Sequence, residues 1–348
     1  MKIIAGLSVI IAATSTLADT NVQKHMKKKS CHKTPAVFAG NSYNSMDQKF
    51  HGKIDLFKTF AHDSENKASN FIGLSNANIF INKRLGKNAN VQINTQYGPI
   101  SVVDTVNAAS NQFQVTEAFV TYLNDARNTQ FKVGKFFTAF ATYNPYKADK
   151  TLAEERLSNL NNNAAELAYV INPASYVKVW AVKPNTSAIK DYYGAKIGYS
   201  FVKNTVKVAA DISMLNDARE TFQAPNGVTL SKNNAYNGQV VVSYGPASMT
   251  AKILKAPKLI DGVTKTPEIK GVALAYDLAV AGHNAKVIGE FEKTSNMDKL
   301  ENANKRVAFM VKTPIDKKLT LVTGVSERSF LAKARKLRTT SIGIEANI

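Results

Sequence analysis

Apolar and polar side chains alternate strictly between residues 71 and 97, on both sides of a turn-like segment, RLGKN. The apolar positions are Ala77, Ile79, Ile81, Val91, Ile93 and Tyr97. The positions between them carry amides: Asn76, Asn78, Asn82, Asn90, Gln92, Asn94 and Gln96. Because successive side chains of a β-strand point to opposite faces, this pattern predicts two strands, each with one apolar and one amide face.

The same alternation continues from about residue 50 to residue 348 and predicts sixteen strands. We place them near residues 50–60, 71–82, 89–97, 112–123, 129–138, 164–171, 175–183, 191–201, 204–214, 235–244, 247–254, 268–278, 283–293, 304–313, 317–327 and 338–348. Long and short connections follow one another: AHDSENKASN precedes KRLGKN, and about twenty-five residues after residue 138 precede NPA. An even number of strands with long loops at one end and tight turns at the other is typical of a bacterial outer-membrane barrel.

The sequence therefore predicts an all-β fold, a transmembrane antiparallel β-barrel of about 16 strands over residues 49–348. In such a barrel the apolar face meets lipid and the amide face lines water, whereas a soluble sandwich would bury its apolar face centrally. Tyr193 and Phe201 share one face and would stand about 20 Å apart along the barrel axis. This spacing approaches the ~25 Å lipid-facing band that aromatic girdles bracket.

The N-terminal residues bear on location. Residues 1–18, MKIIAGLSVIIAATSTLA, have the charge, apolar run and small final residues of a cleaved secretory signal peptide. With the barrel pattern, this predicts the bacterial outer membrane, where the chain contacts lipid and is inserted by the barrel assembly machinery. Residues 19–48 form a polar, lysine-rich periplasmic segment, either a solvated tail or a contact for anionic lipid or cell-wall polymer. The segment is too short for a plug domain, so we predict none.

The charge balance points to an anionic partner. Lysine and arginine number 45 against 26 acidic residues, a formal net charge of +19. Such an excess suits nucleic acid, lipid headgroups or acidic solutes. For an exported barrel we expect lipid and small anionic solutes, and no nucleic acid. The single Cys31 and five unclustered histidines argue against a zinc site, so we expect no metal and no cofactor.

Strand parity places seven basic residues on the face that lines the interior, and rings of such residues favour anions. These candidate pore-lining residues are Lys132, Lys178, Lys196, Lys207, Lys252, Lys286 and Arg306. The same parity gives that face four acidic residues: Glu117, Glu166, Asp211 and Glu290. Two arrangements remain open: anion-selecting rings, or basic residues that sit at the rims or pair with these carboxylates.

The long loop after the fifth strand contains KTLAEERLSNL. Thr151 and Glu154 have the spacing of a capping box. Leu152, Leu157 and Leu160 form an apolar stripe of helical period. One interpretation is a short helix folded into the pore as a constriction, presenting Lys147, Lys150 and Arg156. The other is a helix that packs on neighbouring loops at the surface.

Residues 115–155, VTEAFVTYLNDARNTQFKVGKFFTAFATYNPYKADKTLAEE, resemble the core segment of the LbtU-type siderophore porins, a family of Legionella-like outer-membrane barrels. Residues 117–120 match the family's Glu-Ala-aromatic-Val strand, and residues 134–136 match its Gly-Lys-aromatic strand. Residues 139–141, Ala-Phe-Ala, stand where the family usually has Pro-Phe-Gly, so no binding residues are carried over. The resemblance implies an outer-membrane channel for a ferric siderophore or another anionic solute.

The predicted function is thus passive uptake of an anionic solute, with a ferric siderophore as the leading cargo. A general anion-preferring porin for phosphate or carboxylate solutes is the alternative. Passage through a wet channel needs no catalytic group, so we expect no enzyme. A barrel enzyme and a soluble periplasmic β-protein are more distant alternatives, and the sequence leaves monomer and trimer open.

Overall fold

The computed structural model describes residues 48–63, 69–98, 112–140, 152, 161–183, 191–217, 234–255, 268–280, 283–295, 303–330 and 336–347. The predicted signal peptide and the lysine-rich segment up to residue 47 lie outside the described residues. The sixteen predicted strands are confirmed, with ends that differ from the predicted ones by a few residues. They are β1 (Gln48–Asp63), β2 (Ser69–Leu85), β3 (Ala89–Gly98), β4 (Gln112–Leu123), β5 (Thr129–Phe137), β6 (Asn161–Asn172), β7 (Ser175–Lys183), β8 (Tyr192–Lys203), β9 (Val206–Leu215), β10 (Ala235–Tyr244), β11 (Ala247–Lys255), β12 (Glu268–Val280), β13 (His283–Ser295), β14 (Ala303–Pro314), β15 (Leu319–Phe330) and β16 (Lys336–Asn347).

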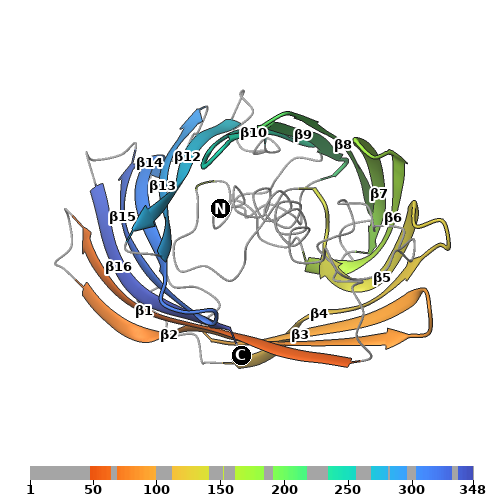
Figure 1. Ribbon diagram of the computed structural model, residues 1–348, viewed down its shortest axis with the longest axis horizontal. Helices are drawn as coiled ribbons and strands as arrows, with labels where there is room; N and C mark the ends of the chain where they lie inside the picture. The colour runs from red at the N-terminus through yellow and green to blue at the C-terminus, as the bar shows by residue number, and fades with distance from the viewer. Residues whose placement is uncertain are drawn as a thin grey trace.

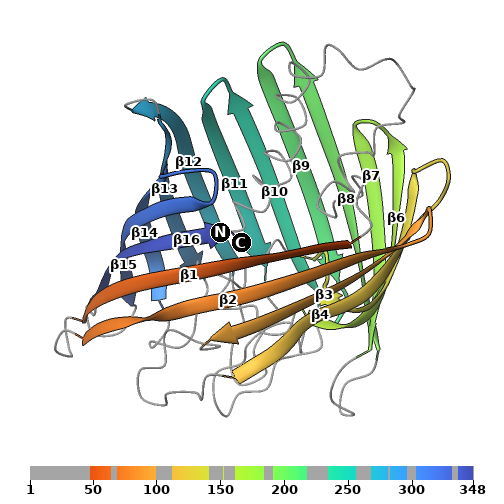
Figure 2. The ribbon, with the colours of Figure 1, turned by 60° about the horizontal axis from the view of Figure 1, so that its bottom comes forward.

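The strands close into one antiparallel barrel. Each strand pairs with its neighbours in the chain, and β1 pairs with β16 to complete the ring. Figures 1 and 2 show the strands following one another round the wall in chain order. At the seam, Lys53 lies opposite Asn347 and Asp63 lies opposite Leu337. The closed ring therefore has no strand edge with unpaired backbone groups, as a lipid environment requires.

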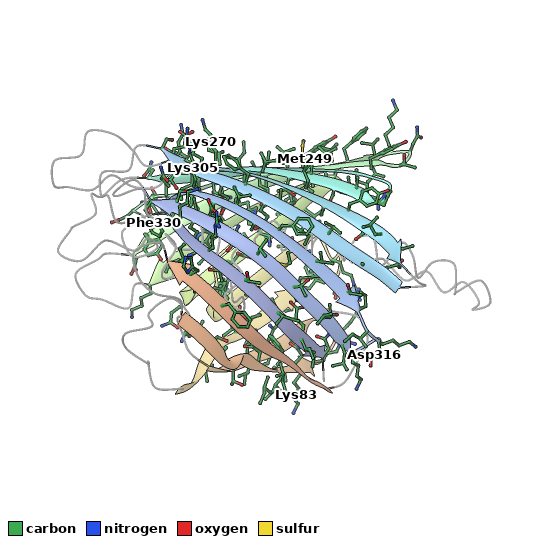
Figure 3. All side chains as sticks on the ribbon, turned by 90° about the vertical axis from the view of Figure 1, so that its left-hand side faces the viewer. Lys83, Met249, Lys270, Lys305, Asp316 and Phe330 are labelled. Carbon is green, nitrogen blue, oxygen red and sulfur yellow. The ribbon has the colours of Figure 1, made fainter. Side chains whose placement is uncertain are left out.

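The two ends of the barrel differ, as the alternation of long and short connections predicts. At one end the chain turns within a few residues, for example at Asn204, with φ of 55°, and at Gly245, with φ of 52°. Figure 3 shows Lys83 and Asp316 near this tight-turn end, and Lys270, Lys305 and Phe330 at the opposite, long-connection end. The antiparallel meander thus puts every long connection on the same side.

The apolar face of the wall points outward. Side chains of alternate residues on β8, among them Tyr193, Ile197 and Tyr199, are at least half exposed. The amide face points inward, because Asn78 and Asn94 are each only 2% exposed. This inside-out arrangement confirms the predicted transmembrane β-barrel over the alternative of a soluble sandwich. No described helix is long and apolar enough to span a bilayer.

Candidate functional site

Side-chain hydrogen bonds link β3, β4 and β5 on the inner face. The Gln92 side chain donates to Asn94 Oδ1 at 3.2 Å, and the Asn94 amide donates to Glu117 Oε2. Glu117 also accepts a hydrogen bond from the backbone N–H of Phe137 at 3.4 Å. An amide both donates and accepts without adding charge, so it can line a polar wall and orient an ionic group beside it. This accounts for Gln92 and Asn94, two of the amides in the alternating pattern of the sequence.

Lys132 lies on the inner face of β5, between two aromatic rings. Its Nζ stands 4.1 Å from the centroid of the Phe119 ring and 4.0 Å from that of the Phe136 ring. The two rings meet edge to face, with centroids 5.8 Å apart and planes at 69°. A ring face attracts a cation because of its quadrupole. Lys132 therefore packs against aromatic side chains of the inner face.

Most of the other predicted basic residues are paired with carboxylates on the inner face. Nζ–O distances are 3.6 Å for Lys178–Glu166, 2.9 Å for Lys196–Asp211, 3.2 Å for Lys286–Asp277 and 2.7 Å for Lys312–Glu345. Sequence parity missed the last pair, which joins β14 to β16. Of the two arrangements that the sequence left open, these residues show pairing with carboxylates. Each pair cancels most of its own charge at a distance.

The most deeply buried charges form a row across β11 to β14. Lys252 lies opposite Gly271, Gly271 opposite Glu292, and Glu292 opposite Arg306. Because Gly271 has no side chain, Lys252 crosses β12 and forms an ion pair with Glu292. Arg306 Nη1 lies 2.7 Å from Glu290 Oε2 and 3.7 Å from Glu292 Oε2. Buried charges are stable only when they are paired in this way.

The chain that follows β5 reaches into the barrel interior. Phe140 is fully buried, and its carbonyl accepts a hydrogen bond from the Ser213 hydroxyl on β9. Leu152 is 2% exposed, and its N–H donates to Glu292 Oε2 at 2.8 Å. Two points of the long loop are therefore attached to β9 and β13, on the inner face. The predicted constriction residues Lys147, Lys150 and Arg156 lie outside the described residues, so their role stays a prediction.

Phe140 and Leu152 belong to an inner apolar cluster that sequence reasoning missed. It also contains Phe119, Phe136, Ala164, Trp180, Val182, Tyr192, Leu215, Ala235, Leu254 and Ile269. Apart from Phe119, its strand residues lie toward the long-connection ends of β5 to β12. The Trp180 ring lies where a Cβ of Gly194 would stand, so only glycine fits there. The sequence contains a sign of this cluster, because in residues 177–183, VKVWAVK, Trp180 and Val182 are apolar residues at inward positions.

Lys207 is the exception among the seven predicted residues. It lies half-buried near the tight-turn end of β9, and no described carboxylate stands within ion-pair distance of it. The described residues also contain no group of three histidine, cysteine or acidic side chains that could hold a metal ion. The described inner wall thus combines ion pairs, amide hydrogen bonds and an apolar cluster, with Lys207 as the least compensated of the predicted cations.

Comparison with solved structures bears on the fold. No protein-family model matches the chain, and no curated protein matches its sequence. An anion-selective porin from Comamonas acidovorans superposes with a TM-score of 0.60 over 86% of this chain and 99% of that one, at 10% identity. OprB of Pseudomonas putida superposes with a TM-score of 0.60 over 87% of this chain and 94% of that one, at 10% identity. The outer membrane channel DcaP of Acinetobacter baumannii superposes with a TM-score of 0.57 over 86% of this chain and 97% of that one, at 12% identity.

The chain has the fold of the outer-membrane porins. Identities this low show the fold alone, and the resemblance of residues 115–155 to the siderophore porins stays a prediction. The porin fold accounts for the outward apolar side chains and for the polar, ion-paired inner face. In a porin fold, residues on the inner face control what passes, so the ion pairs and the attached loop form the candidate functional site.

Proposed function

We propose that this chain is an outer-membrane channel through which small anionic solutes diffuse. The observation that carries the proposal is the inverted wall. Ile197 and Ile212 face outward, 56% and 64% exposed, while Lys196 and Asp211 pair on the inner face. Such a wall suits lipid outside and water inside. The signal-peptide pattern of residues 1–18 and the porin neighbours support the outer membrane as its location.

Three observations support a preference for anions. The chain carries a formal charge of +19, Lys207 faces inward without a described carboxylate partner, and one neighbour is described as an anion-selective porin. The ion pairs limit this preference, because a paired lysine and carboxylate cancel in the field that a passing ion meets. We therefore expect a modest anion preference and no strict exclusion of cations. Diffusion needs no catalytic group, and we propose no enzymatic activity.

The test is ion selectivity in planar bilayers under a KCl gradient. The unmodified channel should give a reversal potential of the anion-selective sign, and Lys207→Gln should move it toward zero. The matched control is the double variant Lys196→Gln/Asp211→Asn, which removes a neutral pair and should leave the reversal potential unchanged. A cation-selective parent channel, or a control that shifts as far as Lys207→Gln, would contradict the charge argument.

Within this function, we propose a ferric siderophore as the leading cargo, on the resemblance of residues 115–155 to the siderophore porins. The alternative cargo is a phosphate- or carboxylate-bearing solute, which the comparison with an anion-selective porin favours. Uptake of radiolabelled ferric siderophore should fall in cells that lack the channel and return when the gene is restored. Unchanged siderophore uptake together with an anion-selective channel would leave the general porin as the function.

A further inference from the structure

The outer face carries three lysines side by side at the long-connection end. Lys270 on β12 lies opposite Lys293 on β13, and Lys293 lies opposite Lys305 on β14. All three are exposed, and Figure 3 shows Lys270 and Lys305 close to the same end of the barrel. Because neighbouring strands lie about 5 Å apart, the three Cα atoms span only about 10 Å. We call these residues the lysine row.

The lysine row is uncompensated at its centre. Like charges directly opposite each other on neighbouring strands destabilise a sheet. Lys270 has a carboxylate at one side, with its Nζ 2.8 Å from Glu268 Oε1. Among the described residues, no carboxylate stands within ion-pair distance of Lys293 or Lys305. Farther round the wall, by contrast, Arg338 and Lys336 share Glu327 at 2.7 and 3.1 Å. Apart from Glu268 beside Lys270, no carboxylate of the described wall offsets the charge of the row.

The lysine row also marks a boundary on the outer face. The next outward positions on the same three strands are Val272, Phe291 and Val307, which lie opposite one another and are 42%, 47% and 54% exposed. Apolar side chains continue from there toward the tight-turn end. Lysine at such a boundary extends its charge into the headgroup layer while its methylene chain stays on apolar surface. The row therefore stands where phosphate-bearing headgroups meet acyl chains.

We propose that Lys270, Lys293 and Lys305 bind the phosphate groups of lipids with a net negative headgroup, in the leaflet next to the long-connection end. A phosphate offers several strong acceptor oxygens and about the charge that the row lacks. A lipid fits better than a free phosphate, because the apolar row of Val272, Phe291 and Val307 receives the acyl chains of the same molecule. The site lies on the outer face and is independent of the solute that the barrel carries.

The experiment compares lipid binding by the full chain in non-ionic detergent, measured by native mass spectrometry. The probes are lipid A, which bears two phosphates, phosphatidylcholine, and inorganic phosphate. The test variant is Lys270→Gln/Lys293→Gln/Lys305→Gln. The matched control is Lys83→Gln/Lys317→Gln/Lys318→Gln, which removes three exposed lysines at the tight-turn end. At about fivefold per lysine, the test variant should bind lipid A on the order of 100-fold more weakly, and the control should bind as the parent does.

A second measurement keeps the test decisive if the triple variant folds poorly. In detergent without lipid A, Lys293→Gln should melt at or above the parent temperature, because it removes repulsion from the row. With lipid A present, the parent should melt at a higher temperature than Lys293→Gln, because the parent binds lipid A more tightly and is stabilised more by it. Equal lipid A affinity of parent and test variants, equal loss in the control, equal binding of phosphatidylcholine, or full competition by inorganic phosphate would each overturn the proposal.

Discussion

Gly271 shows how a single residue shapes the inner wall. A Cβ at this position would lie 2.6 Å from Lys252 Cε and 3.2 Å from Glu292 Cγ, so a side chain there would separate the two charges. The buried ion pair that joins β11 to β13 therefore depends on the absence of a side chain on β12. The same sheet contains Gly289, around which a Cβ would find nothing within 4 Å.

We expect Gly271→Val to destabilise the barrel by about 3 kcal/mol, because it forces a buried lysine away from its carboxylate. Gly289→Val introduces the same side chain on the neighbouring strand and should leave stability nearly unchanged. Heat-modifiability gels over a temperature series measure both variants. If the two melt together, the Lys252–Glu292 pair contributes little to stability.

A second residue-scale prediction concerns the lipid face. Ile212 is 64% exposed on the outer face of β9, whereas Lys207 on the same strand faces inward. Ile212→Arg should cost ~2–4 kcal/mol if the residue lies near the bilayer midplane, and Lys207→Gln should barely change stability. The melting temperatures of the two variants in lipid vesicles, measured on the same gels, show the difference in stability. Equal tolerance of both changes would mean that lipid does not contact this face.

At the scale of elements, the loop after β5 is the part of the barrel with the clearest attachment to the inner face. Phe140 and Leu152 each make a polar contact through the backbone, Phe140 with Ser213 and Leu152 with Glu292. The side chains of Phe140 and Leu152 belong to the inner apolar cluster. Phe140 therefore lies beside β9 and Leu152 beside β13, both on the inner face. That the loop limits the cross-section open to solutes stays a prediction, which the following variant tests.

Leu152→Ala should release this loop while leaving the barrel wall intact. Truncating a buried leucine costs about 2–5 kcal/mol, but here the loss falls on the loop contact alone. We expect a higher and noisier single-channel conductance with little change in melting. Leu274→Ala, a change of the same size on the lipid face, is the control and should leave conductance unchanged. Unaltered conductance in Leu152→Ala would show that the loop does not narrow the channel.

For the molecule as a whole, the sequence predicts the strands, their faces and the alternation of connections, because all three depend on local periodicity. The ion pairs depend on register between strands, which parity does not fix. Lys196, for example, lies opposite Ser213 and reaches Asp211 diagonally. The Lys252–Glu292 pair is harder still to predict from the sequence, because its partners lie two strands apart. Parity therefore placed basic and acidic residues on the same face and left their pairing open, but it could not say which of them pair, and it missed Lys312 and Glu345.

The pairing of β1 with β16 has a consequence for the kinetics of folding. Lys53 and Asn347 are about 300 positions apart, whereas every other strand pairing joins neighbours in the chain. Contacts between distant segments form late, because the intervening chain must first give up its freedom. Until β16 docks, β1 presents an open edge that another chain can occupy. The step that completes the ring is thus also the step that protects a newly made chain from aggregation.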